Sequence, residues 1–95
     1  MRAIKYTSRF RRDYRREQSG VLGKKIDQLL LDAVNLLAAD QPLPARYCDH
    51  ELVGEWKDHR DCHLRPDLLL IYRKPDAESL ELVRLGSQGS SWNLP

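Results

Sequence analysis

Residues 60–72 read RDCHLRPDLLLIY, and this stretch decides the fold. Pro66 and Asp67 at its centre are typical of a tight turn, and a nearly unbroken apolar run follows them through residue 74. Before the turn, apolar residues are interleaved with charged ones from Trp56 to Leu64. We therefore predict two antiparallel strands, over residues 56–64 and 68–74, joined by a short connection.

Two further strands are predicted on either side of this hairpin. Residues 75–78 read PDAE and form a second turn signal, after which apolar and polar residues alternate again over residues 80–85. At the start of the chain, residues 2–6 show a similar alternation. The sequence thus predicts four strands, one at the beginning and three in its second half.

The first of two predicted helices follows the N-terminal strand. Thr7 or Ser8 can accept a backbone hydrogen bond and cap it, and Phe10 and Tyr14 lie four residues apart on one face. Gly20 and the nearby Gly23 then predict a break.

The second helix has the clearest pattern in the chain. From residue 22 its apolar residues follow a period of 3.6, namely Leu22, Ile26, Leu29, Leu30, Ala33, Leu36 and Leu37. It must end before Pro42 and Pro44, which cannot continue a helix. The order β-α-α-β-β-β predicts an α+β fold, in which two N-terminal helices pack on one face of a small, mainly antiparallel four-stranded sheet. The other face is left for function.

The composition is that of a soluble globular protein. The chain has 95 residues, of which 41% are apolar and 32% charged, and this size suits a single domain over residues 1–95. It has no apolar segment of the roughly 20 residues needed to span a bilayer, and its first residues lack the pattern of a signal peptide. We expect a cytoplasmic protein without membrane association, in which Cys48 and Cys62 remain thiols.

The positive charge is concentrated in the first predicted helix. The net charge of the chain is +2, and five arginines fall between positions 9 and 16. They predict either a solvated helix face or a basic surface that binds a polyanion such as RNA.

Polar residues that can transfer protons lie in the strand before the Pro66 turn. Residues two apart in a strand point the same way, so Asp61 and His63 share one face, while Cys62 and Leu64 share the other. With Cys62 and Leu64 turned to the core, Asp61 and His63 must face the exposed side of the sheet. A carboxylate beside an imidazole suits acid–base chemistry, although such a pair is also common on solvated strands.

Two more candidates flank this pair. Asp67 adds a second carboxylate at the turn, and His50 arrives from the connection over residues 40–54. Histidine and cysteine are also zinc ligands, but Cys62 and His63 point to opposite faces, and no CxxC or HxxxH pair anchors a site. We therefore expect no metal and no cofactor.

The chain resembles the YafQ-type toxins of the RelE/ParE superfamily. The resemblance lies in the segments YTSRFRRDY (residues 6–14), LPARYCDH (43–50), LVGEWK (52–57), RDCHLRPDLLLIY (60–72) and LVRLG (82–86). It implies a RelE-like fold and a ribosome-dependent endoribonuclease that cleaves messenger RNA in the decoding site without a metal. It also implies a cognate antitoxin of the DinJ/RelB type that binds DNA.

The resemblance assigns site residues as well. His50, Asp61, His63 and Asp67 match family active-site positions, and Trp92 matches an aromatic residue that can stack on a base. Arg84 is a further candidate, either as a contact to RNA phosphate or as half of a structural ion pair.

Gln88 departs from the family pattern, which usually has histidine after Gly-Ser or Gly-Thr. Glutamine can hold a substrate by hydrogen bonds but cannot transfer a proton, and losing a general acid or base typically costs about 10²–10⁴ in rate. The residue fits either a natural member of the family that relies on His63 and Asp67, or a substitution that weakens the toxin.

Two other readings remain open. The chain is either a non-catalytic ParE-like toxin on the same fold or a small basic RNA-binding protein. The set of acid–base residues favours the nuclease over both.

Overall fold

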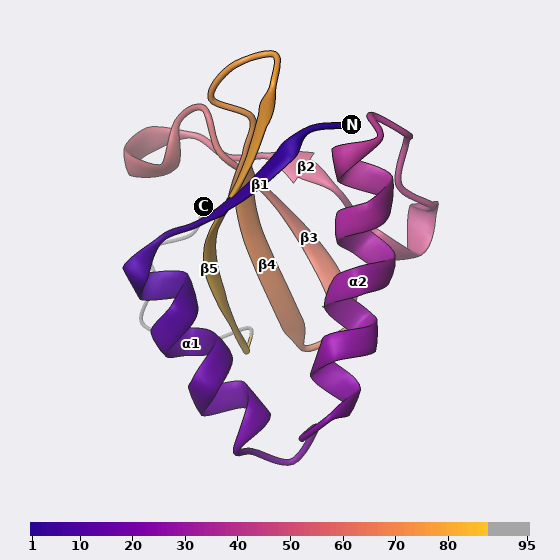
Figure 1. Cartoon of the computed structure of the whole chain (residues 1–95), viewed down its shortest axis with the longest axis vertical. Helices are drawn as coiled ribbons and strands as arrows, with labels where there is room; N and C mark the ends of the chain where they lie inside the picture. Colours follow the sequence, from indigo (N-terminus) through magenta and orange to yellow (C-terminus); the bar gives the residue numbers. More distant parts are fainter. Residues whose placement is uncertain (88–95) are drawn as a thin grey trace.

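Two helices lie on one face of a five-stranded sheet in the computed structural model, which describes residues 1–87 (Figure 1). The helices are α1 (Ser8–Gln18) and α2 (Lys25–Ala38), and the strands are β1 (Ala3–Tyr6), β2 (His50–Glu51), β3 (Arg60–Arg65), β4 (Leu68–Arg73) and β5 (Ser79–Ser87). Two 3₁₀ turns, η1 (Ala45–Tyr47) and η2 (Gly54–Trp56), flank β2. The predicted α+β class is confirmed.

The strands are arranged in the order β1-β5-β4-β3-β2. β1 is parallel to β5, and the other neighbours are antiparallel. The chain thus starts at one edge of the sheet, crosses through both helices to the opposite edge, and returns through successive antiparallel strands.

Local side-chain contacts fix both ends of this crossover. The Thr7 hydroxyl caps α1 by accepting a hydrogen bond from the Phe10 N–H at 3.0 Å, and it donates to the Val83 carbonyl of β5 at 2.8 Å. α2 ends where Asp40 adopts a left-handed backbone with φ of 56°. The Asp40 carboxylate then pairs with Arg2 at 2.8 Å and Lys74 at 2.6 Å, which ties the helix end to the start of β1 and the end of β4.

The hydrophobic core lies between the helices and the sheet. Of the predicted apolar positions, α2 contributes Ile26, Leu30, Ala33 and Leu37 to the core, Leu22 and Leu29 pack against it partly buried, and Leu36 lies outside it. β3 contributes Cys62 and Leu64, both buried. This confirms the predicted phase of β3. None of the helices within residues 1–87 is long and apolar enough to cross a membrane.

The structure corrects two details of the predicted sheet. It contains a fifth strand, β2, because two residues of the connection over residues 40–54 pair with the edge of β3. The predicted strand over residues 56–64 begins only at Arg60, since Gly54 and Asp58 both have φ of 70° and turn the chain through η2 first. Trp56 therefore lies outside the sheet, with its ring edge-on to that of His59.

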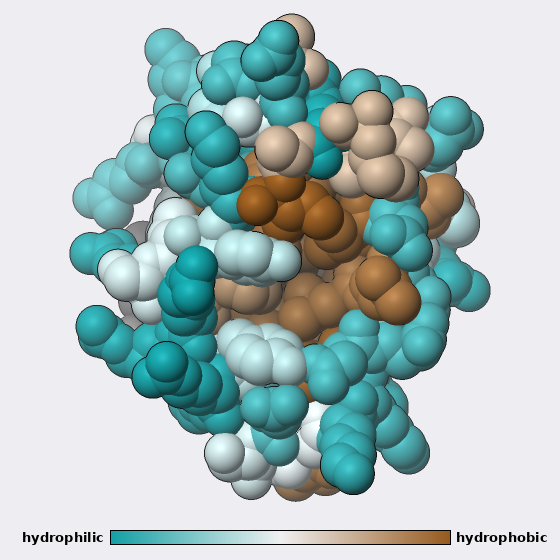
Figure 2. Space-filling view, viewed as in Figure 1, coloured by the Kyte–Doolittle hydropathy of each residue, from teal (hydrophilic) through white to brown (hydrophobic). Residues whose placement is uncertain are grey.

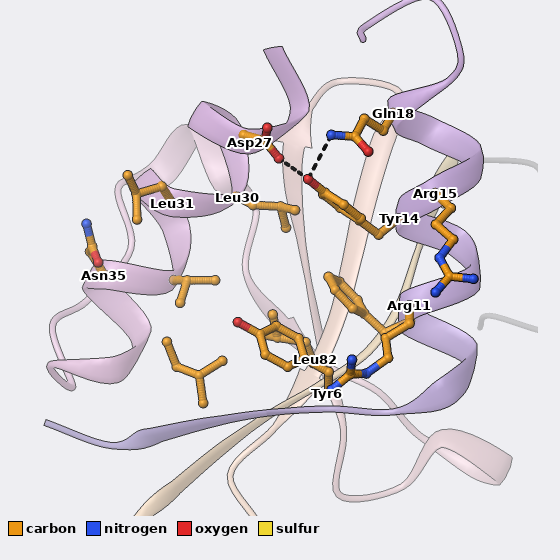
Figure 3. A pocket seen from close by; sticks show the side chains of 13 residues that line it. Tyr6, Arg11, Tyr14, Arg15, Gln18, Asp27, Leu30, Leu31, Asn35 and Leu82 are labelled. Carbon is orange, nitrogen blue, oxygen red and sulfur yellow. Dashed lines mark hydrogen bonds between the residues drawn. The ribbon is translucent and has the colours of Figure 1, made fainter. Parts of the chain in front are cut away.

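The two helices diverge and leave an apolar groove between them. Figure 2 shows apolar side chains gathered in this hollow, whose volume is about 550 Å³. Tyr6 and Leu31 line it and are about half exposed. At one end the Tyr14 hydroxyl donates to the carboxylate of Asp27 and accepts from the amide of Gln18 at 3.1 Å (Figure 3). The groove lies on the helix side of the sheet, opposite the face that carries Asp61 and His63.

Candidate active site

Strand β2 places His50 against Asp61. The two residues are paired in register across β2 and β3, and residues paired in this way carry their side chains on the same face. The His50 Nδ1 lies 2.8 Å from the Asp61 Oδ1. His63, two residues along β3, shares that face, so the structure brings together three of the predicted site residues.

The surroundings of His50 fix which ring nitrogen carries the proton. Its Nδ1 lies 3.0 Å from the carbonyl oxygen of Cys48 as well as 2.8 Å from Asp61. Both neighbours are acceptors, so Nδ1 must carry the hydrogen. The Nε2 atom is left as the nitrogen that can gain or lose a proton, on a side chain that is 53% exposed.

Asp61 is buried, contrary to the prediction that it faces solvent. It is on the predicted face but only 3% exposed. Sequence alternation gives the direction of a side chain but does not show its surroundings, and here the neighbouring strand β2 places His50 against Asp61. Among the described residues, no donor makes a hydrogen bond to its Oδ1. The His50 N–H is directed at the Cys48 carbonyl, so the contact between His50 and Asp61 is mainly electrostatic.

Burial changes the ionisation of Asp61. It raises the pKa of Asp61 above its usual 3.8, and the charges of His50 and His63 oppose this only in part. A buried carboxylate with a raised pKa between two imidazoles is the kind of arrangement found in sites of proton transfer.

His63 is oriented in the same way as His50. Its Nδ1 lies 3.2 Å from the carbonyl oxygen of Pro66, which can only accept, so Nε2 is again the nitrogen left for proton transfer. Asp67 follows directly in the turn between β3 and β4 and is exposed. The turn predicted from Pro66 and Asp67 therefore orients His63, and it carries a second carboxylate at the end of β3.

Asp49 precedes the site residue His50 and was not singled out by the sequence. It lies next to His50, and its carboxylate accepts hydrogen bonds from the hydroxyl of Tyr72 at 2.5 Å and from the guanidinium of Arg60 at 3.3 Å. These partners are 23 and 11 residues away. The available signal was an acidic residue next to a candidate histidine, which does not indicate its partners.

Arg84 takes part in an ion pair with Asp13 of α1. Its Nε and Nη2 donate to the two carboxylate oxygens at 2.7 and 3.2 Å, and the Arg84 side chain is 20% exposed. The predicted structural ion pair is confirmed. Arg84 also lies opposite Ile71, which lies opposite Asp61, so it occupies the same row on the same face of the sheet. A contact with RNA remains a prediction.

The same carboxylate closes an open edge of the sheet. β1 covers β5 only as far as Leu82, and beyond that point α1 supplies the missing partners. Asp13 accepts from the Leu85 N–H at 3.0 Å, and Arg16 donates to the Leu85 carbonyl at 2.9 Å. One arginine of the basic stretch is therefore used to hold α1 against β5.

Two of the predicted site residues follow the last strand in the sequence. Gln88 and Trp92 lie outside the described residues.

Within residues 1–87, no three histidine, cysteine, aspartate or glutamate side chains are grouped so that they could hold a metal ion. Cys48 and Cys62 are free thiols, as predicted.

The chain is similar to known toxins over almost its whole length. Residues 2–90 match the family model described as the bacterial toxin of type II toxin–antitoxin systems, YafQ. A Haemophilus influenzae protein assigned as a YafQ toxin is 40% identical over 86% of this chain and 83% of its own length. The mRNA interferase toxin YafQ of Escherichia coli K12 is 35% identical over 94% of each chain.

Solved structures show the same fold. The crystal structure of a copper-bound mutant toxin from Helicobacter pylori superposes with a TM-score of 0.83 at 30% identity, covering 97% of this chain and 100% of that one. An Escherichia coli YafQ mutant with glutamine in place of a histidine superposes with a TM-score of 0.81 at 33% identity, covering 98% and 100%. From its matched residues, its relatives and its fold, the chain belongs to the YafQ family of bacterial toxins of type II toxin–antitoxin systems.

Proposed function

We propose that this chain is a ribosome-dependent endoribonuclease that cleaves messenger RNA in the decoding site by acid–base catalysis without a metal. The observation that carries the proposal is the matched orientation of two histidines. His50 and His63 each hold Nδ1–H against a backbone carbonyl, and each leaves Nε2 for proton transfer on the face that contains Asp61.

The spacing of the two imidazoles suits a phosphate between them. His50 and His63 are diagonal neighbours on adjacent strands, whose Cα atoms are about 7–8 Å apart, and a proton carrier must come within about 3 Å of the oxygen that it serves. One Nε2 can therefore reach the ribose 2′-hydroxyl while the other reaches the departing 5′-oxygen of the same phosphodiester.

The reaction divides into two proton transfers. One imidazole removes the proton of the 2′-hydroxyl as its oxygen attacks the adjacent phosphorus, which forms a 2′,3′-cyclic phosphate. The other imidazole, in its protonated form, gives a proton to the 5′-oxygen as the P–O bond breaks. Asp61 stabilises positive charge on the imidazoles, Asp67 lies at the rim of the site, and Arg84 adds positive charge for the phosphate.

Gln88 lowers the rate in this proposal. Where the family has a third histidine, glutamine can still hold the RNA by hydrogen bonds, but proton transfer is left to the two histidines of β2 and β3. Trp92 is proposed to stack on a base of the message.

A DinJ-like antitoxin that binds DNA is the proposed partner that controls this activity. Crystal structures of the Escherichia coli DinJ–YafQ toxin–antitoxin complex contain a chain that superposes on this one with TM-scores of 0.77 and 0.76 at 30% identity.

Mapping cleavage on a translated message tests the proposal. The chain should cut a message in a translation extract and should leave the same RNA intact without ribosomes. His63→Ala and His50→Ala should each lower the cleavage rate at least 100-fold. His59→Ala is the matched control, because His59 also bonds a carbonyl through Nδ1 but lies against Trp56 rather than Asp61.

Several outcomes would contradict the proposal. Equal cleavage rates for His63→Ala and His59→Ala would show that the two-histidine site takes no part in the reaction. Efficient cutting of naked RNA would show that cleavage does not depend on the ribosome. Growth arrest without any RNA cleavage would instead favour a non-catalytic ParE-like toxin.

A further inference from the structure

His50 depends on a short segment that has little else to hold it. β2 has two residues and pairs only with β3 among the described strands, so its backbone bonds are few. Tyr47 before the segment and Leu52 after it are buried, but residues 48–51 between them are not. A ring nitrogen that must stay within 2.8 Å of Asp61 needs a firmer anchor than this backbone supplies.

Asp49 is in the right place to be that anchor. The backbone of Cys48 is left-handed, with φ of 48° and ψ of 41°, and it turns the chain just before Asp49. The Asp49 carboxylate then reaches the helix side of the sheet, where it bonds Tyr72 and Arg60, while His50 lies over Asp61 on the opposite side. The adjacent residues Asp49 and His50 thus contact the sheet on its two opposite faces.

The partners of Asp49 are themselves fixed. Tyr72 is 1% exposed and lies in the hydrophobic core, paired in register with Arg60. Burial and the neighbouring Asp49 raise the pKa of Tyr72, so it remains a hydroxyl donor at all physiological pH values. A buried donor of this kind requires an acceptor, and the 2.5 Å bond to Asp49 supplies it.

We propose that Asp49 is a positioning residue for catalysis: through Tyr72 and Arg60 it anchors β2 to the core, and thereby holds His50 against Asp61 with its proton on Nδ1. The step from position to rate rests on the proposed function, because it assumes that His50 takes part in the cleavage. The proposal that Asp49 anchors β2 does not depend on that function.

The test uses variants that change the anchor without touching His50. Tyr72→Phe removes one hydroxyl and no charge, and Asp49→Ala removes the acceptor. Asp49→Asn keeps an oxygen for the Tyr72 hydroxyl and serves as the conservative variant. Tyr47→Phe is the matched control, since it removes another buried tyrosine hydroxyl, one that faces Arg46 instead of Asp49.

The first readout is independent of nuclease activity. Nitrogen-15 NMR of the neutral imidazoles distinguishes Nδ1–H from Nε2–H. His50 should be in the Nδ1–H form in the parent chain and in Tyr47→Phe. In Tyr72→Phe and Asp49→Ala it should shift to a mixture containing Nε2–H, the more stable form of a free imidazole. Asp49→Asn should lie between them, and His63 should not change in any variant.

The second readout is the cleavage rate of ribosome-bound message. Tyr72→Phe should lower kcat at least tenfold with little change in KM, because the substrate contacts remain and only a proton carrier is displaced. An unchanged Nδ1–H signal of His50 in folded Tyr72→Phe and Asp49→Ala overturns the proposal, whatever the cleavage rate. A shifted signal with an undiminished rate supports the anchor and contradicts the place of His50 in the proposed reaction.

Discussion

Replacing Asp13 by alanine should destabilise the protein more than any change to an exposed carboxylate. Asp13 is 2% exposed and accepts hydrogen bonds from the Leu85 N–H and from the guanidinium groups of Arg84 and Arg16. Removing it leaves a backbone donor of β5 without an acceptor and removes the carboxylate that pairs with Arg84. α1 also loses a main attachment to β5.

The magnitude follows from the burial of each group. Breaking a buried ion pair costs about 3–5 kcal/mol, and an unsatisfied buried donor costs about 1–3 kcal/mol. Arg84 and Arg16 are 20% and 53% exposed, so water compensates for part of the loss. We therefore expect the free energy of unfolding to fall by about 3 kcal/mol, which is a large share of the roughly 5–15 kcal/mol of a small domain.

Urea unfolding followed by circular dichroism measures this loss. With a slope of roughly 1 kcal/mol per molar urea for a chain of this size, the midpoint should fall by roughly 3 M. Asp32→Ala is the control, because Asp32 is exposed on α2 and accepts from Gln28; its midpoint should shift by less than roughly 0.5 M. A midpoint for Asp13→Ala within the range of that control would refute the role assigned to Asp13.

The pH dependence provides a second check on the same residue. Burial opposes ionisation of Asp13, but hydrogen bonds from Arg84 and Leu85 outweigh it and hold the pKa of Asp13 below its usual 3.8. Its contribution to stability is therefore complete above 3.8 and is lost as the pH falls through the lower pKa of the folded state. The parent chain should lose its advantage over Asp13→Asn in that acidic range.

Three further predictions concern other residues. Burial raises the pKa of Asp61, so ionised Asp61 costs stability. In matched urea titrations the parent chain should lose stability relative to Asp61→Asn as the pH rises above 3.8 and through the raised pKa; a relative gain would contradict this. Thr7→Ala should cost about 1–2 kcal/mol in thermal or urea unfolding through loss of the α1 cap, while Thr7→Ser should stay within about 0.5 kcal/mol. Arg84→Gln should lower the affinity for ribosome-bound message and its salt dependence together, and an unchanged salt dependence would leave Arg84 a purely structural residue.

The parts of the fold that were predictable are those set by local pattern. The 3.6 period around Ile26 and Leu30 defines α2, the Thr7 cap starts α1, and alternation at Cys62 and Leu64 phases β3. The strand β2 was not predictable, because two residues are too few to show an alternation and their pairing depends on a distant strand.

The candidate site likewise has a part that was predictable from the sequence and a part that was not. The shared direction of Asp61 and His63 follows from spacing within one strand, and the place of His50 came from resemblance to a family. Asp61 is buried in the assembled fold, where His50 of β2 lies against it, and the role of Asp49 depends on Tyr72, 23 residues away. Such contacts are created by the tertiary fold and leave no local signal.

The cleavage rate of ribosome-bound message should be compared among the parent chain, Gln88→His, and Gln88→His combined with His63→Ala. We predict that Gln88→His raises the rate by an order of magnitude or more, because it adds a proton carrier, and that the added His63→Ala abolishes the gain. The same cleavage rate for all three proteins, or no cleavage by any of them, would contradict the assignment of this face of the sheet as a nuclease site.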